Sequence, residues 1–82
     1  MHEKINEPIK VLASFLKGQV SPLSFVWQGR RYNPTKINLV HSERKGKGKI
    51  YYFSVSDNSN FYRLAFNNEN LNWRLMEIYS QN

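Results

Sequence analysis

The chain has 82 residues, enough for one small domain and too few for two. Its content of 40% hydrophobic and 15% aromatic residues is too high for a disordered chain, and the absence of cysteine excludes disulfides and thiolate metal sites. Twelve Lys and Arg residues against six Asp and Glu give a formal net charge of +6, which favours anionic partners such as nucleic acid.

The N-terminal residues are polar and charged, with no apolar core of a secretory signal, and no long apolar run occurs anywhere in the chain. We therefore expect a cytoplasmic protein with no membrane partner. Residues 1–7 are expected to form a flexible tail, and residues 8–80 a single β domain.

Short runs of Val, Ile, Tyr, Phe and Trp alternate with Gly, Pro, Asn and Asp, a pattern typical of strands joined by tight turns. Gln28 and Gly29 are expected to form a two-residue hairpin loop, and Pro34 to interrupt one strand. The fold class is therefore all-β, an antiparallel meander that forms a curved sheet or a small barrel. The pattern predicts about six strands: 9–16, 23–27, 30–33 resuming as 36–41, 50–56, 61–66 and 71–79.

The expected loops fix a register, because each loop dictates which residues face each other. With residues 57–60 as a loop Val55 faces Tyr62, and with residues 67–70 as a loop Leu64 faces Trp73. One face of the sheet is then almost entirely apolar, and we expect it to be the core. Its residues are Leu39, His41, Tyr51, Phe53, Val55, Tyr62, Leu64, Phe66, Leu71, Trp73 and Leu75.

The opposite face is basic and aromatic. The same register places Arg63 directly across from Arg74, and facing arginines are unfavourable unless an anion lies between them. Tyr52 and Phe61 lie beside this pair, and Lys36 shares their face. Cations for phosphates next to flat rings for bases are the combination that single-strand binders use, so these residues form a candidate nucleic-acid platform. Alternatively, the aromatic rings close a small barrel and the arginines extend into water.

Residues 43–49 form the densest basic stretch, in which Arg44, Lys45, Lys47 and Lys49 alternate with glycine. At a hairpin tip these side chains are expected to contact phosphates. The alternative is that they only keep a turn soluble. The stretch is no phosphate-binding P-loop, because the required glycine spacing and the following helix are missing.

Catalytic patterns are absent from the sequence. The two histidines have no Ser and acid arranged around them as a triad, and the six acids are scattered singly, without the pairs that acid–base or metal chemistry requires. We expect no enzyme activity, no cofactor and no metal site.

Several runs resemble a known family: FVWQGRRY at 25–32, YFSV at 52–55, YRLAF at 62–66, WRL at 73–75 and IY at 78–79. The chain is similar, over about residues 8–79, to a small uncharacterised bacterial β domain. That domain is often appended to the C-terminus of Y-family DNA polymerase-like repair proteins, and it also occurs as short stand-alone proteins. The family carries no established catalytic residues.

The resemblance implies a DNA-repair or nucleic-acid role. We expect an accessory module whose partner is nucleic acid, single-stranded rather than duplex, or a repair protein. The alternative is a protein-interaction module that docks to a larger enzyme and does not contact nucleic acid.

Overall fold

The computed structural model describes residues 1–80, which form seven strands in one antiparallel sheet. The strands are β1 (His2–Leu16), β2 (Gln19–Trp27), β3 (Arg30–Tyr32), β4 (Lys36–Lys45), β5 (Gly48–Ser56), β6 (Asn60–Asn67) and β7 (Asn72–Ser80). Their order in the sheet is β3-β2-β1-β7-β6-β5-β4, and the sheet is not closed. The prediction of an all-β, antiparallel, curved sheet is confirmed, and the sheet stops short of a barrel.

The strand count differs from the prediction because residues 30–33 and 36–41 do not continue one strand. They belong to β3 and β4, which are the two opposite edges of the sheet. β3 pairs only with β2. Pro34 cannot donate a ladder hydrogen bond, and directly after it the Thr35 amide bonds to the Ser56 carbonyl, which starts β4 on its new partner β5.

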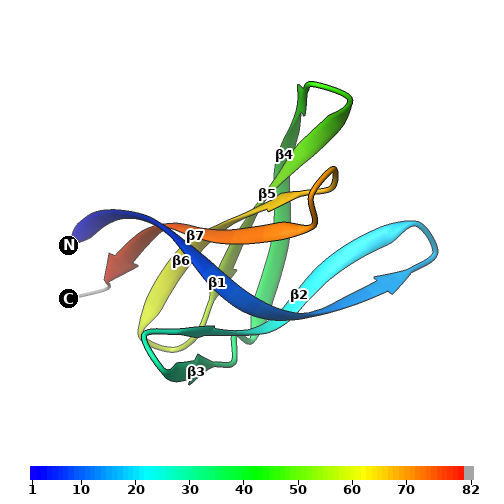
Figure 1. Ribbon diagram of the computed structural model, residues 1–82. Helices are drawn as coiled ribbons and strands as arrows, with labels where there is room; N and C mark the ends of the chain where they lie inside the picture. Colours follow the sequence, from blue (N-terminus) through cyan, green and yellow to red (C-terminus); the bar gives the residue numbers. More distant parts are fainter. Residues whose placement is uncertain (81–82) are drawn as a thin grey trace.

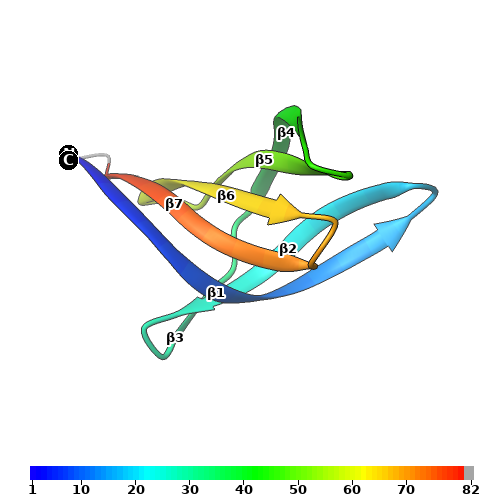
Figure 2. The ribbon, with the colours of Figure 1, turned by 45° about the horizontal axis from the view of Figure 1, so that its top comes forward.

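Two meanders, β1–β3 and β4–β7, are joined by pairing of the first strand with the last. Figures 1 and 2 show that the long β1 lies beside β7 in its first half and beside β2 in its second half. The expected flexible tail at residues 1–7 is therefore wrong: His2 pairs with Tyr79, and the Met1 amino group bonds to the Ser80 carbonyl at 3.1 Å. β7 lies inside the sheet, and its backbone groups need this second partner.

The tight turns follow the expected chemistry. Gln28 and Gly29 both have positive φ, at 52° and 74°, which matches the type I′ turn favoured in two-residue hairpins and confirms that predicted loop. Lys17 and Gly18 form an equivalent turn between β1 and β2. The loop expected over residues 43–49 is shorter in the structure, because Lys45 still pairs with Gly48.

The core lies on the inner face of the curved sheet, where the β1–β2 hairpin crosses over β5, β6 and β7. Phe25 of β2 is 1% exposed, and its ring stacks on Tyr32 at 4.9 Å and meets the edge of Tyr62 at 5.3 Å. We call this part of the sheet the closed end. The open end is formed by the two hairpin tips, at residues 17–18 and 46–47, and by the β6–β7 turn, on the right-hand side of Figure 1.

Most residues of the predicted core face are buried, but Tyr51 is half-buried and three others are exposed. Leu39 is 57% exposed at the open end and Leu71 is 67% exposed in the β6–β7 turn. His41 was expected in the core and is exposed, because a bulge at Val40 moves it to the outer face, opposite Tyr52. The predicted core residues that are buried are Phe53, Val55, Tyr62, Leu64, Phe66, Trp73 and Leu75.

Candidate nucleic-acid interface

The outer face of the sheet does not hold the predicted pair of facing arginines. Arg63 on β6 lies across from Glu77, whereas Arg74 on β7 lies across from Ala65. The register differs because the β6–β7 turn begins one residue later than expected and because β7 holds an extra, unpaired residue at Met76. The prediction that the two arginines face each other is wrong, and no bound anion is needed to separate them.

Arg74 has a structural task instead. Its Nε donates to the Asn6 side-chain oxygen at 2.8 Å, and its Nη2 donates to the Asn6 carbonyl at 2.6 Å. Asn6 has a φ of 53° and lies in a bulge of β1, a left-handed conformation that costs energy in most residues. The planar guanidinium therefore holds the bend of β1 in place and is occupied by protein atoms.

The surroundings of Arg63 include an acidic group. The His2 ring stacks on Tyr79 with centroids 4.3 Å apart, and its Nε2 lies 2.7 Å from the Glu77 carboxylate. This hydrogen bond is the main cause that lowers the pKa of Glu77. An ionised carboxylate across from Arg63 opposes the approach of a polyanion to this part of the outer face.

Tyr52 is also partly occupied. The His41 ring stacks on it at 4.7 Å and 20°, so one face of the phenol ring is covered. Burial, and then the nearby Glu43 carboxylate, raise the pKa of Tyr52. Glu43 also lies 3.6 Å from His41. A base that stacks on Tyr52 is left with the other face of the ring and lies beside a negative charge.

Phe61 and Lys36 lie at the other end of the outer face. Lys36 pairs with Ser56, which pairs with Phe61, so the two side chains share one row across β4, β5 and β6. Phe61 is 42% exposed. The predicted platform residues Tyr52, Phe61, Arg63 and Arg74 all lie on the outer face. Of these, Arg74 is bonded to Asn6, and one face of the Tyr52 ring is covered by His41.

The basic tip, which we define as Arg44, Lys45, Lys47 and Lys49, stands at the open end between β4 and β5. It is held by the β6–β7 turn, since the Lys49 amide donates to the Asn68 side-chain oxygen at 2.8 Å. Gly48 allows this contact: a Cβ there would lie 2.6 Å from the same oxygen. Glycine at this strand position permits the close approach of the β6–β7 turn.

The positive charge of the molecule is not neutralised internally. In the described part of the chain, no Lys or Arg nitrogen lies within 4.0 Å of a carboxylate oxygen, and the two ion-pair contacts, at Glu77 and Glu43, both involve histidine. Among the described residues, the Arg74 guanidinium is bonded to Asn6 and that of Arg31 donates to the Ser24 hydroxyl at 3.3 Å. The cations of the basic tip make no such bond to this part of the chain and are available to an external anion.

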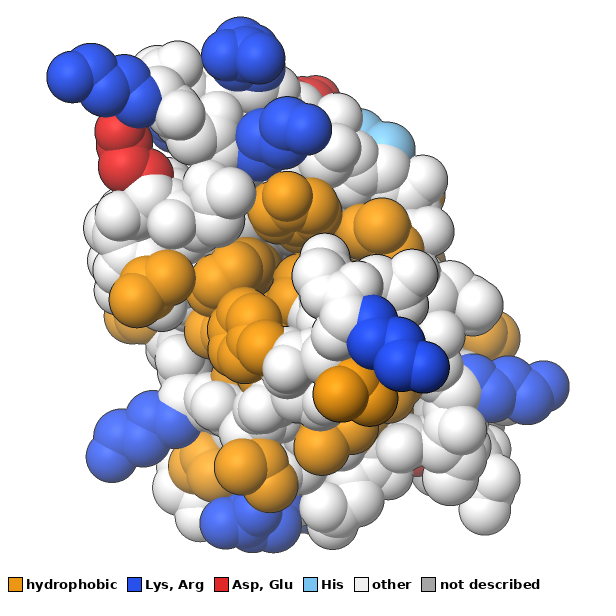
Figure 3. Space-filling model, turned by 90° about the vertical axis from the view of Figure 1, so that its right-hand side faces the viewer, with side chains coloured by type: hydrophobic (Ala, Val, Ile, Leu, Met, Phe, Trp, Pro, Cys, Tyr) orange, Lys and Arg blue, Asp and Glu red, His pale blue; other side chains and the backbone are white. Residues whose placement is uncertain are grey.

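A cavity of about 500 Å³ opens on the inner face beside this tip. Figure 3 views this side of the molecule and shows hydrophobic side chains gathered in a hollow, with Lys and Arg side chains above it. Phe15 is 65% exposed at its rim. The residues that line it are Phe15, Gly18, Gln19, Val20, Leu39, Tyr51, Phe66 and Asn68.

Two residues of the basic tip, Arg44 and Lys49, share the cavity's face of the β4–β5 hairpin. Ser42 pairs with Tyr51, and Arg44 pairs with Lys49 two residues further along each strand. Side chains two residues apart on a strand point to the same side, about 7 Å apart. Arg44 and Lys49 therefore lie next to Tyr51 on the cavity side of the sheet.

Sequence reasoning placed Tyr51 and Phe66 correctly on the inner face but did not find the cavity. The alternation of side chains identifies a face, and it does not say whether the opposite layer reaches that face. One signal was present: Phe15 and Leu16 directly precede the Lys17 and Gly18 turn, where full burial is hard to achieve.

Comparison of the chain with protein-family models, with curated proteins and with solved structures finds no match. The resemblance to the β domain of Y-family polymerase-like proteins stays a prediction. Over residues 1–80, no helix is long and apolar enough to cross a membrane, and no group of three or more His, Cys, Asp or Glu is placed to hold a metal ion.

Proposed function

We propose that the protein binds single-stranded nucleic acid at its open end and acts in the cytoplasm as an accessory module of DNA repair. The observation that carries the binding proposal is the position of Arg44 and Lys49 beside an aromatic cavity on the same face of one hairpin. The repair role and the cytoplasmic setting rest on the sequence alone.

The charge of the chain supports a polyanionic ligand. A net charge of +6 without Lys or Arg ion pairs in residues 1–80 attracts phosphates at long range. Each Lys or Arg that contacts a phosphate also releases a condensed counterion, which contributes entropy to binding. The four cations of the basic tip are close enough in sequence to follow one short stretch of backbone.

The spacing of the open end supports a ligand with both charge and flat rings. Phosphates over Arg44 and Lys49 would leave the attached bases about 7 Å away along the strand, at the position of Tyr51. Base–aromatic stacking stabilises single-strand complexes by about 1–3 kcal/mol per base. A phosphate-only ligand would make no use of the cavity.

A single strand fits this arrangement better than a duplex. In a duplex both faces of every base are covered by neighbouring bases, so a ring cannot enter a cavity lined by Phe15 and Tyr51. An unpaired base has free faces and a flexible backbone. We therefore expect the duplex form of the same sequence to bind at least tenfold more weakly, which corresponds to about 1.4 kcal/mol of binding free energy.

A fluorescence-anisotropy titration tests the proposal. Labelled oligonucleotides of about 12 nucleotides, single-stranded and duplex, are titrated at about 50 and about 200 mM salt. If all four cations of the basic tip contact phosphates, affinity for the single strand falls by about fifty-fold between the two salt concentrations.

A double variant identifies the surface. Arg44→Gln with Lys49→Gln removes two phosphate contacts and should reduce the salt slope by about 1.4. Lys4→Gln with Lys10→Gln is the matched control, because it removes the same charge from exposed positions on β1 that do not line the cavity. Equal losses in both variants, or binding that ignores salt, would overturn the proposal.

A protein-interaction module is the second candidate, and the exposed leucines favour it. Leu12, Leu16, Leu23 and Leu39 are 45–66% exposed on the β1–β2 hairpin and on the edge strand β4. Apolar surface near an unpaired strand edge is the kind of site that accepts a peptide or a larger enzyme. Binding of this kind should hardly respond to salt, so the same titration separates the two candidates.

A further inference from the structure

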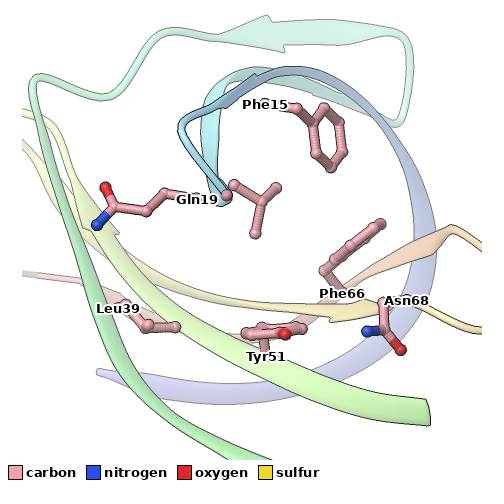
Figure 4. Close-up of a pocket in the computed structure, with 8 residues that line it drawn as sticks. Phe15, Gln19, Leu39, Tyr51, Phe66 and Asn68 are labelled. Carbon is pink, nitrogen blue, oxygen red and sulfur yellow. The ribbon is translucent and has the colours of Figure 1, made fainter.

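The cavity at the open end has the form of a slot with two aromatic walls. In Figure 4, Phe15 lies on one side, Leu39 and Tyr51 lie on the other, and Phe66 lies to one side between them. The Phe66 ring is 5.9 Å from Phe15 and 6.3 Å from Tyr51, measured between centroids. The Phe66 ring is tilted by 62° to Phe15 and by 33° to Tyr51, so a flat group that stacks on Tyr51 meets the other rings at an angle.

Few polar groups line this slot, and one of them has a fixed orientation. The side-chain oxygen of Asn68 accepts the Lys49 amide hydrogen at 2.8 Å. The side-chain nitrogen must then point the other way, and Figure 4 shows it on the side of Tyr51 and Phe66. In residues 1–80 this NH₂ group makes no hydrogen bond to protein, so it offers two free donors to whatever occupies the slot.

We infer that the slot takes one unpaired thymine or uracil base, stacked on Tyr51 and in contact with Phe15, with its O4 carbonyl oxygen accepting from the Asn68 NH₂ group. This inference rests on the proposed function and adds to it the class of base. Cytosine has the same ring size but carries an amino group in place of O4. Two donors would then face each other, and the pairing is lost.

Homopolymers of thymidine and deoxycytidine of equal length provide the test, because both are pyrimidines of similar shape. The wild-type protein should bind oligo(dT) about fivefold more tightly than oligo(dC), as expected for one neutral hydrogen bond. Asn68→Asp keeps an oxygen for the Lys49 amide but replaces the donors with an acceptor. That variant should lose the preference for oligo(dT) or reverse it.

Asn70→Asp is the matched control. It adds the same negative charge in the same turn, where the Asn70 oxygen already accepts from the Asn72 amide, and Asn70 does not line the cavity. It should keep the preference for oligo(dT). Phe15→Ala should lower the affinity for both oligonucleotides by at least about fivefold, because one aromatic surface of the slot is removed.

The outcomes separate this inference from the function on which it rests. Salt-dependent binding of oligo(dT) and oligo(dC) with equal affinity would overturn the base preference and leave single-strand binding intact. If Asn68→Asp still prefers oligo(dT), another residue must cause the preference, and the proposed role of Asn68 is overturned. If neither oligonucleotide binds, both proposals fail together.

Discussion

The two ends of the same sheet use aromatic residues differently. Phe25 and Phe15 both belong to the β1–β2 hairpin and both point to the inner face, yet Phe25 is 1% exposed and Phe15 is 65% exposed. At the closed end, Tyr32 and Tyr62 surround Phe25 on the facing strands. At the open end the hairpins diverge, and the rings meet only at Phe66.

The difference indicates where stability resides and where apolar surface is left over. Burial of an aromatic ring contributes to folding in proportion to the area removed from water, so the closed end carries most of this contribution. The open end keeps Phe15 and Leu39 exposed next to unpaired cations. Contiguous exposed apolar surface of this kind usually marks an interaction site.

The largest expected effect comes from truncating the two phenylalanines in turn. Phe25→Ala removes a fully buried ring and should lower the free energy of unfolding by about 3–5 kcal/mol. Phe15→Ala removes an exposed ring and should lower it by about 1 kcal/mol or less. Urea unfolding followed by circular dichroism measures both. Similar losses in the two variants would mean that the open end is packed as tightly as the closed end.

A smaller effect is expected at the contact that holds the basic tip. Gly48→Ala places a Cβ against the Asn68 oxygen and also 2.9 Å from the Glu69 Cβ, so the β4–β5 tip and the β6–β7 turn must separate. Overpacking of this kind costs about 1–3 kcal/mol. Amide exchange should accelerate at Lys49, whose hydrogen bond to Asn68 is lost. Unchanged exchange at Lys49 would show that the turn adapts without strain.

Substitution of Arg74 tests the contribution of the bend in β1, which brings the β1–β2 hairpin over the sheet. Arg74→Lys keeps the charge but cannot make both the side-chain and the carbonyl bond to Asn6, so we expect a loss of about 1 kcal/mol in unfolding free energy. Arg63→Lys is the control, since Arg63 makes no such pair of bonds among the described residues, and it should change stability little. Equal losses of unfolding free energy in the two variants would show that Arg74 acts only as a surface charge and that its bonds to Asn6 do not stabilise the fold.

Much of the fold was accessible from the sequence because strands with one buried face alternate in composition. The pairing of Val55 with Tyr62 followed from the loop at residues 57–60 and is confirmed, as is the hairpin at Gln28 and Gly29. The pairing of β1 with β7 was not accessible. It joins the two ends of the chain, and no loop connects those strands.

The candidate site was less accessible for two physical reasons. A bulge at Val40 shifts one register and moves His41 out of the core. The β6–β7 turn begins one residue later than expected, which separates Arg63 from Arg74, and a bulge at Met76 then sets Glu77 across from Arg63. Bulges leave no reliable mark in the residue types themselves. The position of Arg44 and Lys49 beside the cavity depends on the turn at Gly46 and on the divergence of the two hairpins. Only the turn can be predicted from the sequence.

The smallest expected effect lies at the closed end and concerns acid stability. Burial alone would raise the pKa of Asp57, but hydrogen bonds donated by the Asn60 and Ser59 amides and by the Tyr62 hydroxyl outweigh it and lower the pKa below the ordinary value of 3.8. The folded state then binds this proton more weakly than the unfolded state does. Its contribution to stability is present above about pH 4 and is lost as the pH falls through the folded pKa.

Asp57→Asn removes this titration while its side-chain oxygen can still accept from the two amides. Between about pH 5 and about pH 2, the melting temperature of the wild-type protein should therefore fall further than that of the variant, by no more than about 4 °C. Glu77, whose pKa is also lowered, titrates in both proteins and cancels in the difference. If the melting temperatures of the two proteins fall in parallel over this pH interval, the acid sensitivity belongs to Glu77. It then lies at the paired chain termini, away from the closed end.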